Sequence, residues 1–272
     1  MDISIGDTHL VGEVTGPADG PALVLLHSIG LSTRDGWREQ AGFLAAAGWR
    51  VVSFDFRGLG QSPRGMHSPT VAQLVADTAA LLDALGIGRA VFMGVSLGGF
   101  VSQILGLDYP DRVRALVLVS TAEKIAIGNS GARAERNRRI LAEGMEVAAG
   151  PQIDSHFPAA YRAAALGVMD WYRGHYLAND PQTYVGVMED LGRFDSAARL
   201  GEIRCPTLIV AGGADTSNVA GPVPGAAART LAAKIPGAEV AIIDGAHHYP
   251  HLDHAEEFNA RVGRFLAGLA DE

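Results

Sequence analysis

Short aliphatic runs recur along the chain and are separated by longer segments with helical periodicity. The runs are Ala22–His27, Arg50–Asp55, Ala90–Val95, Val113–Val119, Thr207–Ala211 and Glu239–Ile243. Apolar runs without a period-two alternation are typical of strands that are buried on both faces of a parallel sheet. The six runs therefore predict the strands of one mostly parallel sheet.

Amphipathic segments occupy the intervals between these runs. The clearest are Thr70–Leu85, Leu97–Asp108 and Ala255–Leu269. In the first of them the apolar residues recur close to the 3.6-residue period of a helix. Strands that alternate with helices predict the α/β class, with helices flanking the central sheet.

The alternation of strands and helices stops between residues 123 and 200. This stretch has a helical pattern throughout, includes a helix that starts at Pro181, and holds seven of the chain's eighteen Phe, Trp and Tyr residues. We interpret it as a helical cap over the carboxyl edge of the sheet, and ordinary packing helices are the alternative. The predicted organisation is a core of residues 1–122 and 201–272 with a cap at 123–200.

Composition narrows the classes of function. Hydrophobic residues make up 48% of the chain, which supports a sizeable core, and the formal net charge of −8 argues against binding to nucleic acid. The single cysteine excludes an internal disulfide and a cysteine-ligated zinc site. We find neither a signal-peptide pattern nor an apolar run of membrane-spanning length, so we expect a cytoplasmic protein without a membrane partner. The sequence gives no indication of oligomeric state.

A serine stands at the junction of a predicted strand and a predicted helix. The strand Ala90–Val95 leads into G-V-S-L-G-G at positions 94–99, which matches G-x-S-x-G in the strand–turn–helix context that the motif requires. The turn lifts the serine hydroxyl above the sheet, and side chains two positions before and after it would clash. The motif predicts Ser96 as a nucleophile, and a chance tight turn is the alternative.

With this motif, several segments together resemble the α/β-hydrolase fold family over nearly the whole chain. H-S-I-G at 27–30 resembles the family's H-G-x-G oxyanion loop, with Ser28 in place of the usual glycine. F-D-F-R-G-L-G-Q-S at 54–62 resembles its D-x-R-G-x-G-x-S turn, and I-R-C-P-T at 203–207 resembles the entry to the strand that delivers the acid. The resemblance implies an α/β-hydrolase fold with an oxyanion hole formed by the backbone N–H groups of Ile29 and Leu97.

The acid of such a triad follows the serine in the chain, at the carboxyl end of a strand beyond the cap. Asp215 has both the order and the position, although an aspartate after two glycines can also be a turn residue. Glu123 is the substitute placement. Asp195 and Asp244 are the weaker candidates.

Four histidines lie between positions 247 and 254, after the last predicted strand. The family's spacing, counted back from Asp253, identifies His248 as the catalytic base and leaves His247 where the family usually has glycine. His247 is the alternative base. We expect His251 and His254 to be partly exposed loop and helix-start residues.

The same cluster partly matches the H-x-H-x-D-H pattern of metallo-β-lactamase-type hydrolases. Position 249 is tyrosine, however, and no histidine follows position 254. A catalytic zinc needs three protein ligands of fixed geometry. We therefore expect no metal and no cofactor.

The expected activity is hydrolysis of a small-molecule carboxylic ester or lactone by a triad of Ser96, Asp215 and His248. The H-S-I-G loop and parts of the cap most resemble the 3-oxoadipate enol-lactonase branch, which implies cap aromatic residues as pocket walls: Phe157, Trp171, Tyr172 and Tyr176. A cation for an anionic lactone is available from the arginines of one predicted helix, although a solvated helix face is the other interpretation: Arg133, Arg136, Arg138 and Arg139. Thioesterases, C–C bond hydrolases, cofactor-free perhydrolases and slow ligand receptors of the same fold stay open.

Overall fold

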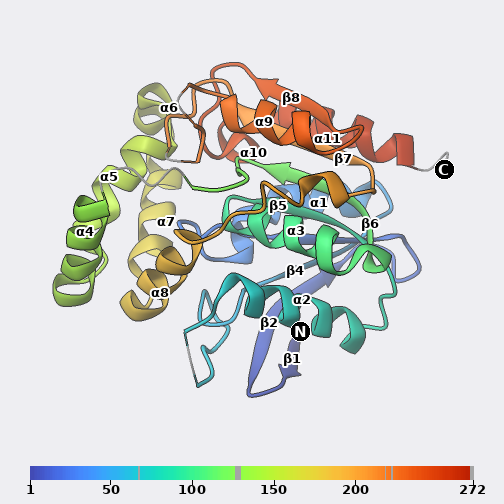
Figure 1. The fold of residues 1–272 in the computed structure, drawn as a ribbon, viewed down its shortest axis with the longest axis horizontal. Coiled ribbons are helices and arrows are strands. Elements are labelled where there is room, and N and C mark those ends of the chain that lie inside the picture. The colour runs from blue at the N-terminus through green and yellow to red at the C-terminus, as the bar shows by residue number, and fades with distance from the viewer. Residues whose placement is uncertain (67, 126–129, 218, 222, 270–272) are drawn as a thin grey trace.

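The computed structural model describes residues 1–66, 68–125, 130–217, 219–221 and 223–269. In this part of the chain, eight strands form one sheet in the order β1-β2-β4-β3-β5-β6-β7-β8 (Figure 1). Strands β3 to β8 run parallel, and β1 and β2 are antiparallel to their neighbours. The strands span Asp2–Ile5 (β1), Thr8–Thr15 (β2), Ala22–Leu26 (β3), Arg50–Phe54 (β4), Ala90–Val95 (β5), Val113–Val119 (β6), Thr207–Gly212 (β7) and Glu239–Ile243 (β8).

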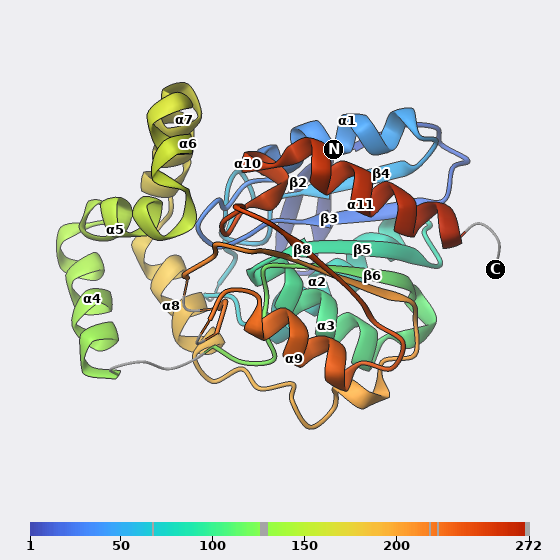
Figure 2. The ribbon, with the colours of Figure 1, turned by 90° about the horizontal axis from the view of Figure 1, so that it is seen from above.

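Helices cover both faces of the sheet. Figure 2 shows α1 and α11 on one face and α2, α3 and α9 on the other, which gives three layers. These helices span Arg38–Ala46 (α1), Val71–Ala84 (α2), Leu97–Asp108 (α3), Ala226–Lys234 (α9) and Ala255–Gly268 (α11); Pro250–Asp253 forms the short α10. The α/β class predicted from the sequence is confirmed, with its mostly parallel sheet and flanking helices.

All six predicted strands are present, within one residue of their expected ends. The central strands β5 and β7 are buried along their whole length, which is why their sequences lack an apolar–polar alternation. The predicted helices are present as α2, α3 and α11. Helix α2 starts after Thr70, whose side chain accepts a hydrogen bond from the backbone N–H of Gln73 at 3.2 Å.

The apolar runs do not reveal the first two strands, β1 and β2. Both lie towards one edge of the sheet, and their residues are mostly exposed or half-buried. An edge strand of this kind has few aliphatic residues in succession, so its sequence resembles a loop. A turn at Gly6, which has a φ of 56°, reverses the chain between them.

Among the described residues between β6 and β7, five α-helices gather at one end of the sheet (Figures 1 and 2). They span Ser130–Glu143 (α4), Glu146–His156 (α5), Ala159–Ala164 (α6), Leu166–Leu177 (α7) and Pro181–Leu191 (α8). As expected, Pro181 is the first residue of its helix, where a missing N–H costs nothing. The division into a core and a cap domain stays a prediction, and we use "cap helices" for α4 to α8. None of the helices in the described ranges combines the length and apolarity that a membrane span requires.

The loops after β3 and β5 lie where the chain switches from adding strands on one side of β3 to adding them on the other side. The chain passes from β3 to β4 on one side and then crosses to β5 on the other side of β3. In open α/β sheets the loops after the strands that flank such a crossing diverge and leave a crevice, where ligands commonly bind. The loop after β3 begins with His27, and the turn after β5 contains Ser96.

Candidate active site

Ser96 occupies a strained backbone conformation between β5 and α3. Its φ of 52° and ψ of −110° are unusual for a residue with a side chain, and such conformations typically cost about 1–3 kcal/mol. The Ser96 N–H donates to the carbonyl of Val119 on the neighbouring strand at 2.9 Å. This pairing with β6 holds the turn in place, so the serine hydroxyl is raised at the carboxyl end of the sheet.

Two glycines allow the turn at Ser96. A Cβ on Gly94 would lie 2.1 Å from the carbonyl oxygen of Gly98, and a Cβ on Gly98 would lie 2.2 Å from the carbonyl oxygen of Leu26. The Gly98 N–H also donates to the carbonyl of His27 at 3.1 Å. The first turn of α3 is therefore fixed directly against the loop that follows β3.

The two amides expected to bind an oxyanion lie in these adjoining segments. Leu97 is the first residue of α3, so its N–H has no acceptor within the helix. Across the described ranges, neither the Leu97 N–H nor the Ile29 N–H donates a hydrogen bond to another residue. Both amides are thus available to a ligand, and their role in an oxyanion hole stays a prediction.

Ser28, which replaces the usual glycine of the oxyanion loop, has a packing role. Its hydroxyl accepts a hydrogen bond from the Leu31 N–H at 2.8 Å and lies 2.9 Å from the hydroxyl of Tyr249. Ser28 does not need a positive φ, so its side chain introduces no backbone strain. Ser28 therefore does not disturb the shape of the loop after β3. Its hydroxyl joins this loop to Tyr249 in the loop after β8.

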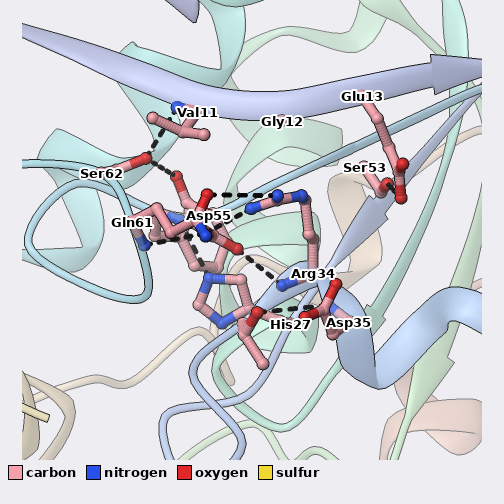
Figure 3. Close-up of polar contacts among 12 residues, drawn as sticks. Val11, Gly12, Glu13, His27, Arg34, Asp35, Ser53, Asp55, Gln61 and Ser62 are labelled. Atoms are coloured by element: carbon pink, nitrogen blue, oxygen red, sulfur yellow. Dashed lines mark hydrogen bonds and ion pairs between the residues drawn. The ribbon is translucent and has the colours of Figure 1, made fainter. Parts of the chain in front are cut away.

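A polar network beneath the same loop is drawn in Figure 3, where Arg34 and Gln61 both converge on Asp55. The Asp55 carboxylate accepts from the Arg34 N–H at 2.7 Å, from the Arg34 guanidinium at 2.6 Å and from the Gln61 N–H at 2.9 Å. Asp55 is fully buried, and charge-assisted bonds of this kind are strong in such surroundings. The D-x-R-G-x-G-x-S turn therefore anchors the end of the oxyanion loop.

His27 belongs to this network and has a defined tautomer. Its Nε2 accepts a hydrogen bond from the Phe56 N–H at 2.9 Å, so the proton lies on Nδ1, 2.8 Å from the carbonyl oxygen of Ser28. Burial lowers the pKa of His27. The neutral His27 ring thus joins the loop after β3 to the turn after β4 through the Phe56 N–H.

Asp215 and His248 meet below the cap helices. His248 Nδ1 lies 3.0 Å from Asp215 Oδ2, and both side chains are almost fully buried. Burial raises the pKa of Asp215, but the charge and hydrogen bond of His248, together with hydrogen bonding to Ser217, outweigh it, so the pKa is about 2. An ionised carboxylate can only accept, so the His248 Nδ1 carries a proton and Nε2 is the basic nitrogen.

Ser217 completes this pair and was not expected from the sequence. Its N–H donates to Asp215 Oδ1 at 2.8 Å, and its hydroxyl lies 3.1 Å from His248 Nδ1. The only signal in the sequence is its position two residues after the predicted acid, where an Asx turn would place its N–H. Ser217 therefore holds the carboxylate in the orientation that faces the ring.

The other acidic candidates lie away from His248. Glu123 forms an ion pair with Lys234, and Asp195 lies on a short bridge with Lys124. Asp244 is exposed in the loop after β8. Of the four carboxylates considered, the structure brings only Asp215 to the histidine ring.

The histidines of the loop after β8 have separate surroundings. The His247 N–H donates to Asp253 Oδ2 at 2.9 Å, and its backbone does not have a positive φ, so glycine is not required there. The ring of His254 lies 3.0 Å from the same carboxyl group, at Oδ1. Within the described ranges, no group of three or more His, Cys, Asp or Glu residues is placed to hold a metal ion.

His251 differs from the expectation of a partly exposed residue. It is 1% exposed and stacks on Trp37, with ring centroids 4.2 Å apart. Burial, and to a lesser extent the charge of His248, lowers the pKa of His251 to about 3. The apolar surface of Trp37, distant in sequence, explains why this polar residue is buried.

A histidine from the cap helices packs directly on the predicted base. The rings of His156 and His248 stack with centroids 4.2 Å apart and planes inclined by 30°, and the His248 N–H donates to the carbonyl of His156 at 3.2 Å. Gln152 lies 2.9 Å from His156 Nε2. Burial lowers the pKa of His156 well below its ordinary value, and the nearby His248 lowers it further.

Ser96 and His248 line one cavity of about 530 Å³ between the sheet and the cap helices. In the ranges the structure describes, no hydrogen bond joins the Ser96 hydroxyl to the histidine. The cavity also includes Ile29 and Ser217. Its remaining boundary comes from the loop residues Gly30, Thr216 and Val219, from Phe100 of α3 and Ile125 after β6, and from cap residues that include Arg136, Val147, Gln152, His156, Tyr184 and Met188.

The four aromatic residues expected to line the pocket are not among those around this cavity. Phe157, Tyr172 and Tyr176 are completely buried, and they pack against one another and against Tyr249. Trp171 is half-buried and contacts the ring of His175. These large side chains form the apolar interior of the cap helices, because burying their area stabilises that layer.

The chain is similar to known proteins over most of its length. A family model described as alpha/beta hydrolase fold matches residues 21–255. The chain belongs to the α/β-hydrolase family. Among relatives, a putative carbamate hydrolase RutD from Variovorax paradoxus (strain S110) is 31% identical over 264 residues, covering 95% of this chain and 96% of that protein.

Two further similar proteins are named enol-lactonases. The 3-oxoadipate enol-lactonase 2 of Acinetobacter baylyi (strain ATCC 33305 / BD413 / ADP1) is 28% identical over 200 residues, covering 74% of this chain and 73% of that protein. The crystal structure of the enol-lactonase from Burkholderia xenovorans LB400 has a TM-score of 0.89 and 28% identity, covering 98% of this chain and all of that chain. This α/β-hydrolase is therefore related to the enol-lactonases, as the resemblance implied.

Proposed function

We propose that this α/β-hydrolase cleaves a carboxylic ester or lactone through an acyl-enzyme intermediate. The observation that carries the proposal is that a strained serine after β5 and a histidine paired with a buried carboxylate line the same cavity. Among the described residues, the N–H groups of Ile29 and Leu97, in the segments next to the serine, have no acceptor. A nucleophile, an oriented base and oxyanion donors are the parts that acyl transfer requires.

In the proposed mechanism, His248 Nε2 accepts the proton of the Ser96 hydroxyl as its oxygen attacks the carbonyl carbon of the substrate. Asp215 keeps the Nδ1–H tautomer and stabilises the imidazolium that forms. The imidazolium then gives its proton to the departing alkoxide oxygen. In the second step, His248 Nε2 accepts a proton from a water molecule, whose oxygen attacks the carbonyl carbon of the acyl-enzyme. The bond to the Ser96 oxygen then breaks, and this oxygen takes the proton back from the imidazolium. The ester or lactone is thus hydrolysed to an acid and an alcohol, and the serine is regenerated.

The oxyanion of each tetrahedral intermediate would be bound by the N–H groups of Ile29 and Leu97. One such donor is typically worth about 3–4 kcal/mol of the barrier. Because Gly98 links the first turn of α3 to the carbonyl of His27, the two amides are held in a fixed relation to one another. Such preorganisation means that the donors need not rearrange during the reaction.

A carbamate is the second candidate substrate class. Its support is the identity of 31% and 32% with two proteins named putative carbamate hydrolase, each aligned over at least 90% of this chain. A carbamate presents the same kind of carbonyl to a serine nucleophile, with an amine or alkoxide leaving group. The two classes are distinguished by turnover of a matched ester and carbamate that share one alcohol.

The test is hydrolysis of short 4-nitrophenyl esters and labelling with a fluorophosphonate. Ser96→Ala should abolish both. Ser155→Ala is the matched control, because Ser155 lines the same cavity and its hydroxyl only donates to the carbonyl of Gln152 at 3.0 Å. Undiminished turnover or labelling of Ser96→Ala would contradict the assignment, as would equal losses in the two variants.

A further inference from the structure

One guanidinium in the cavity has no protein partner for two of its nitrogen atoms. Arg136 lies on α4 and lines the cavity that holds Ser96 and His248. Its Nε and Nη2 atoms are buried, and neither has a hydrogen-bond partner. Within the described ranges Arg136 forms no ion pair. Buried charged groups normally have partners, since an unpaired one loses its hydration without compensation.

The other charged residues around the cavity are neutralised. Glu135 forms an ion pair with Arg138, and Arg139 forms one with Glu143, in which the two nitrogen–oxygen distances are both 2.9 Å. His156 contributes no competing positive charge, because burial lowers its pKa. Arg136 therefore leaves one positive charge of the cavity boundary uncompensated.

Tyr184 lines the same cavity as Arg136. Burial raises the pKa of Tyr184, and the nearby positive charge of Arg136 partly offsets that rise. The Tyr184 hydroxyl accepts a hydrogen bond from that of Tyr176 at 3.2 Å. Among the described residues, no carboxylate forms an ion pair with this guanidinium, so an anion in the cavity would be its natural partner.

We infer that Arg136 binds a carboxylate of the substrate, one that is separate from the carbonyl attacked by Ser96. This inference rests on the proposed hydrolase function and narrows it to esters or lactones with a carboxylate on the acyl side. A carboxylate matches the single uncompensated charge, and the planar guanidinium presents adjacent N–H donors to its two oxygens. The binding would position the scissile carbonyl beside the serine.

Two esters of equal chain length test the inference. The acyl groups of 4-nitrophenyl hydrogen glutarate and 4-nitrophenyl pentanoate each have five carbons and differ only in whether the chain ends in a carboxylate or a methyl group. Replacing Arg136 by Met should lower the glutarate-to-pentanoate ratio of kcat/KM at least about tenfold, mainly by raising KM for the glutarate ester. The Ser96→Ala variant gives the non-enzymatic background.

Arg133→Met is the matched control, because it removes the same charge from the same helix at a residue that does not line the cavity. The glutarate-to-pentanoate ratio of kcat/KM for Arg133→Met should stay close to that of the unmodified protein. An unchanged ratio in Arg136→Met, or an equal fall in both variants, would overturn the inference. Should Arg136→Met fail to fold, as judged by circular dichroism, Arg136→Lys replaces it and should give an intermediate ratio, because it keeps the charge and loses the planar fork.

Binding of glutarate separates this inference from the proposed function. Isothermal titration calorimetry should show glutarate binding to the unmodified protein, and at least about tenfold weaker binding to the Arg136 variant. If neither ester is hydrolysed but this difference is found, the hydrolase proposal fails and the carboxylate site stands. Equal binding by both proteins, or no binding of glutarate to the unmodified one, would refute the carboxylate site.

Discussion

Replacement of Asp215 by Asn removes the charge that pairs with His248 while keeping the size of the side chain. The pKa of Asp215 lies at about 2, compared with an ordinary value of 3.8. At about 1.4 kcal/mol per pKa unit, this difference corresponds to about 2 kcal/mol of folding free energy at pH 7. The carboxyl group is 2% exposed, so solvent screening diminishes this value little.

The pH dependence follows from the direction of the shift. A carboxyl group with a lowered pKa in the folded protein stabilises it fully above the unfolded-state pKa, and this contribution is lost as the pH falls through the folded-state pKa. The window for Asp215 is therefore between pH 4 and pH 2, approximately. Between pH 6 and pH 3 the contribution should fall by about 1 kcal/mol.

The assay is urea unfolding at pH 6 and pH 3, monitored by circular dichroism, for the unmodified protein, Asp215→Asn and Asp244→Asn. Asp215→Asn should be destabilised by about 2 kcal/mol at pH 6 and by about 1 kcal/mol at pH 3. Asp244 is exposed, so its substitution should change stability by less than about 0.5 kcal/mol. A loss that is equal at both pH values, or no greater than that of the control, would refute the reasoning.

Two further predictions concern the base and the turn. His248→Ala should reduce ester turnover by at least about three orders of magnitude, whereas His247→Ala should keep most of it; the opposite result would make His247 the base. Gly98→Ala should cost about 1–3 kcal/mol in a thermal unfolding experiment and lower kcat, because its Cβ would lie 2.2 Å from the Leu26 carbonyl. Gly42→Ala, where a Cβ meets nothing within 4 Å, is the control and should cause neither loss.

The central sheet could be predicted because burial on both faces leaves a clear mark in the sequence. The residues of β5 and β7 are buried without exception, so their runs are continuous. The mostly exposed or half-buried β1 and β2 leave no such mark. In this fold the serine, the acid and the histidine follow one another along the chain, and this order selects Asp215 as the acid. In the structure, Asp215 Oδ2 lies 3.0 Å from His248 Nδ1.

The cap helices were less predictable, because their packing depends on contacts between residues far apart in the chain. The pattern indicates helices there but not which face of α5 meets the loop after β8, so the stacking of His156 on His248 has no local signal. The resemblance to the enol-lactonases implied aromatic pocket walls, yet Tyr172 and Tyr176 are fully buried and stack on one another. Arg136 likewise has the same sequence context as its paired neighbours.

The contact between α5 and the loop after β8 has a consequence for engineering. The carbonyl of His156 accepts from the His248 backbone, and its ring covers one side of the His248 ring. A chimera that exchanged residues 123–200 for the corresponding segment of a relative would therefore alter the packing of the proposed base as well as the substrate cavity. Grafts intended to change specificity alone should retain α5, which carries this contact, and vary α4 and α8, which contribute other residues to the boundary of the cavity.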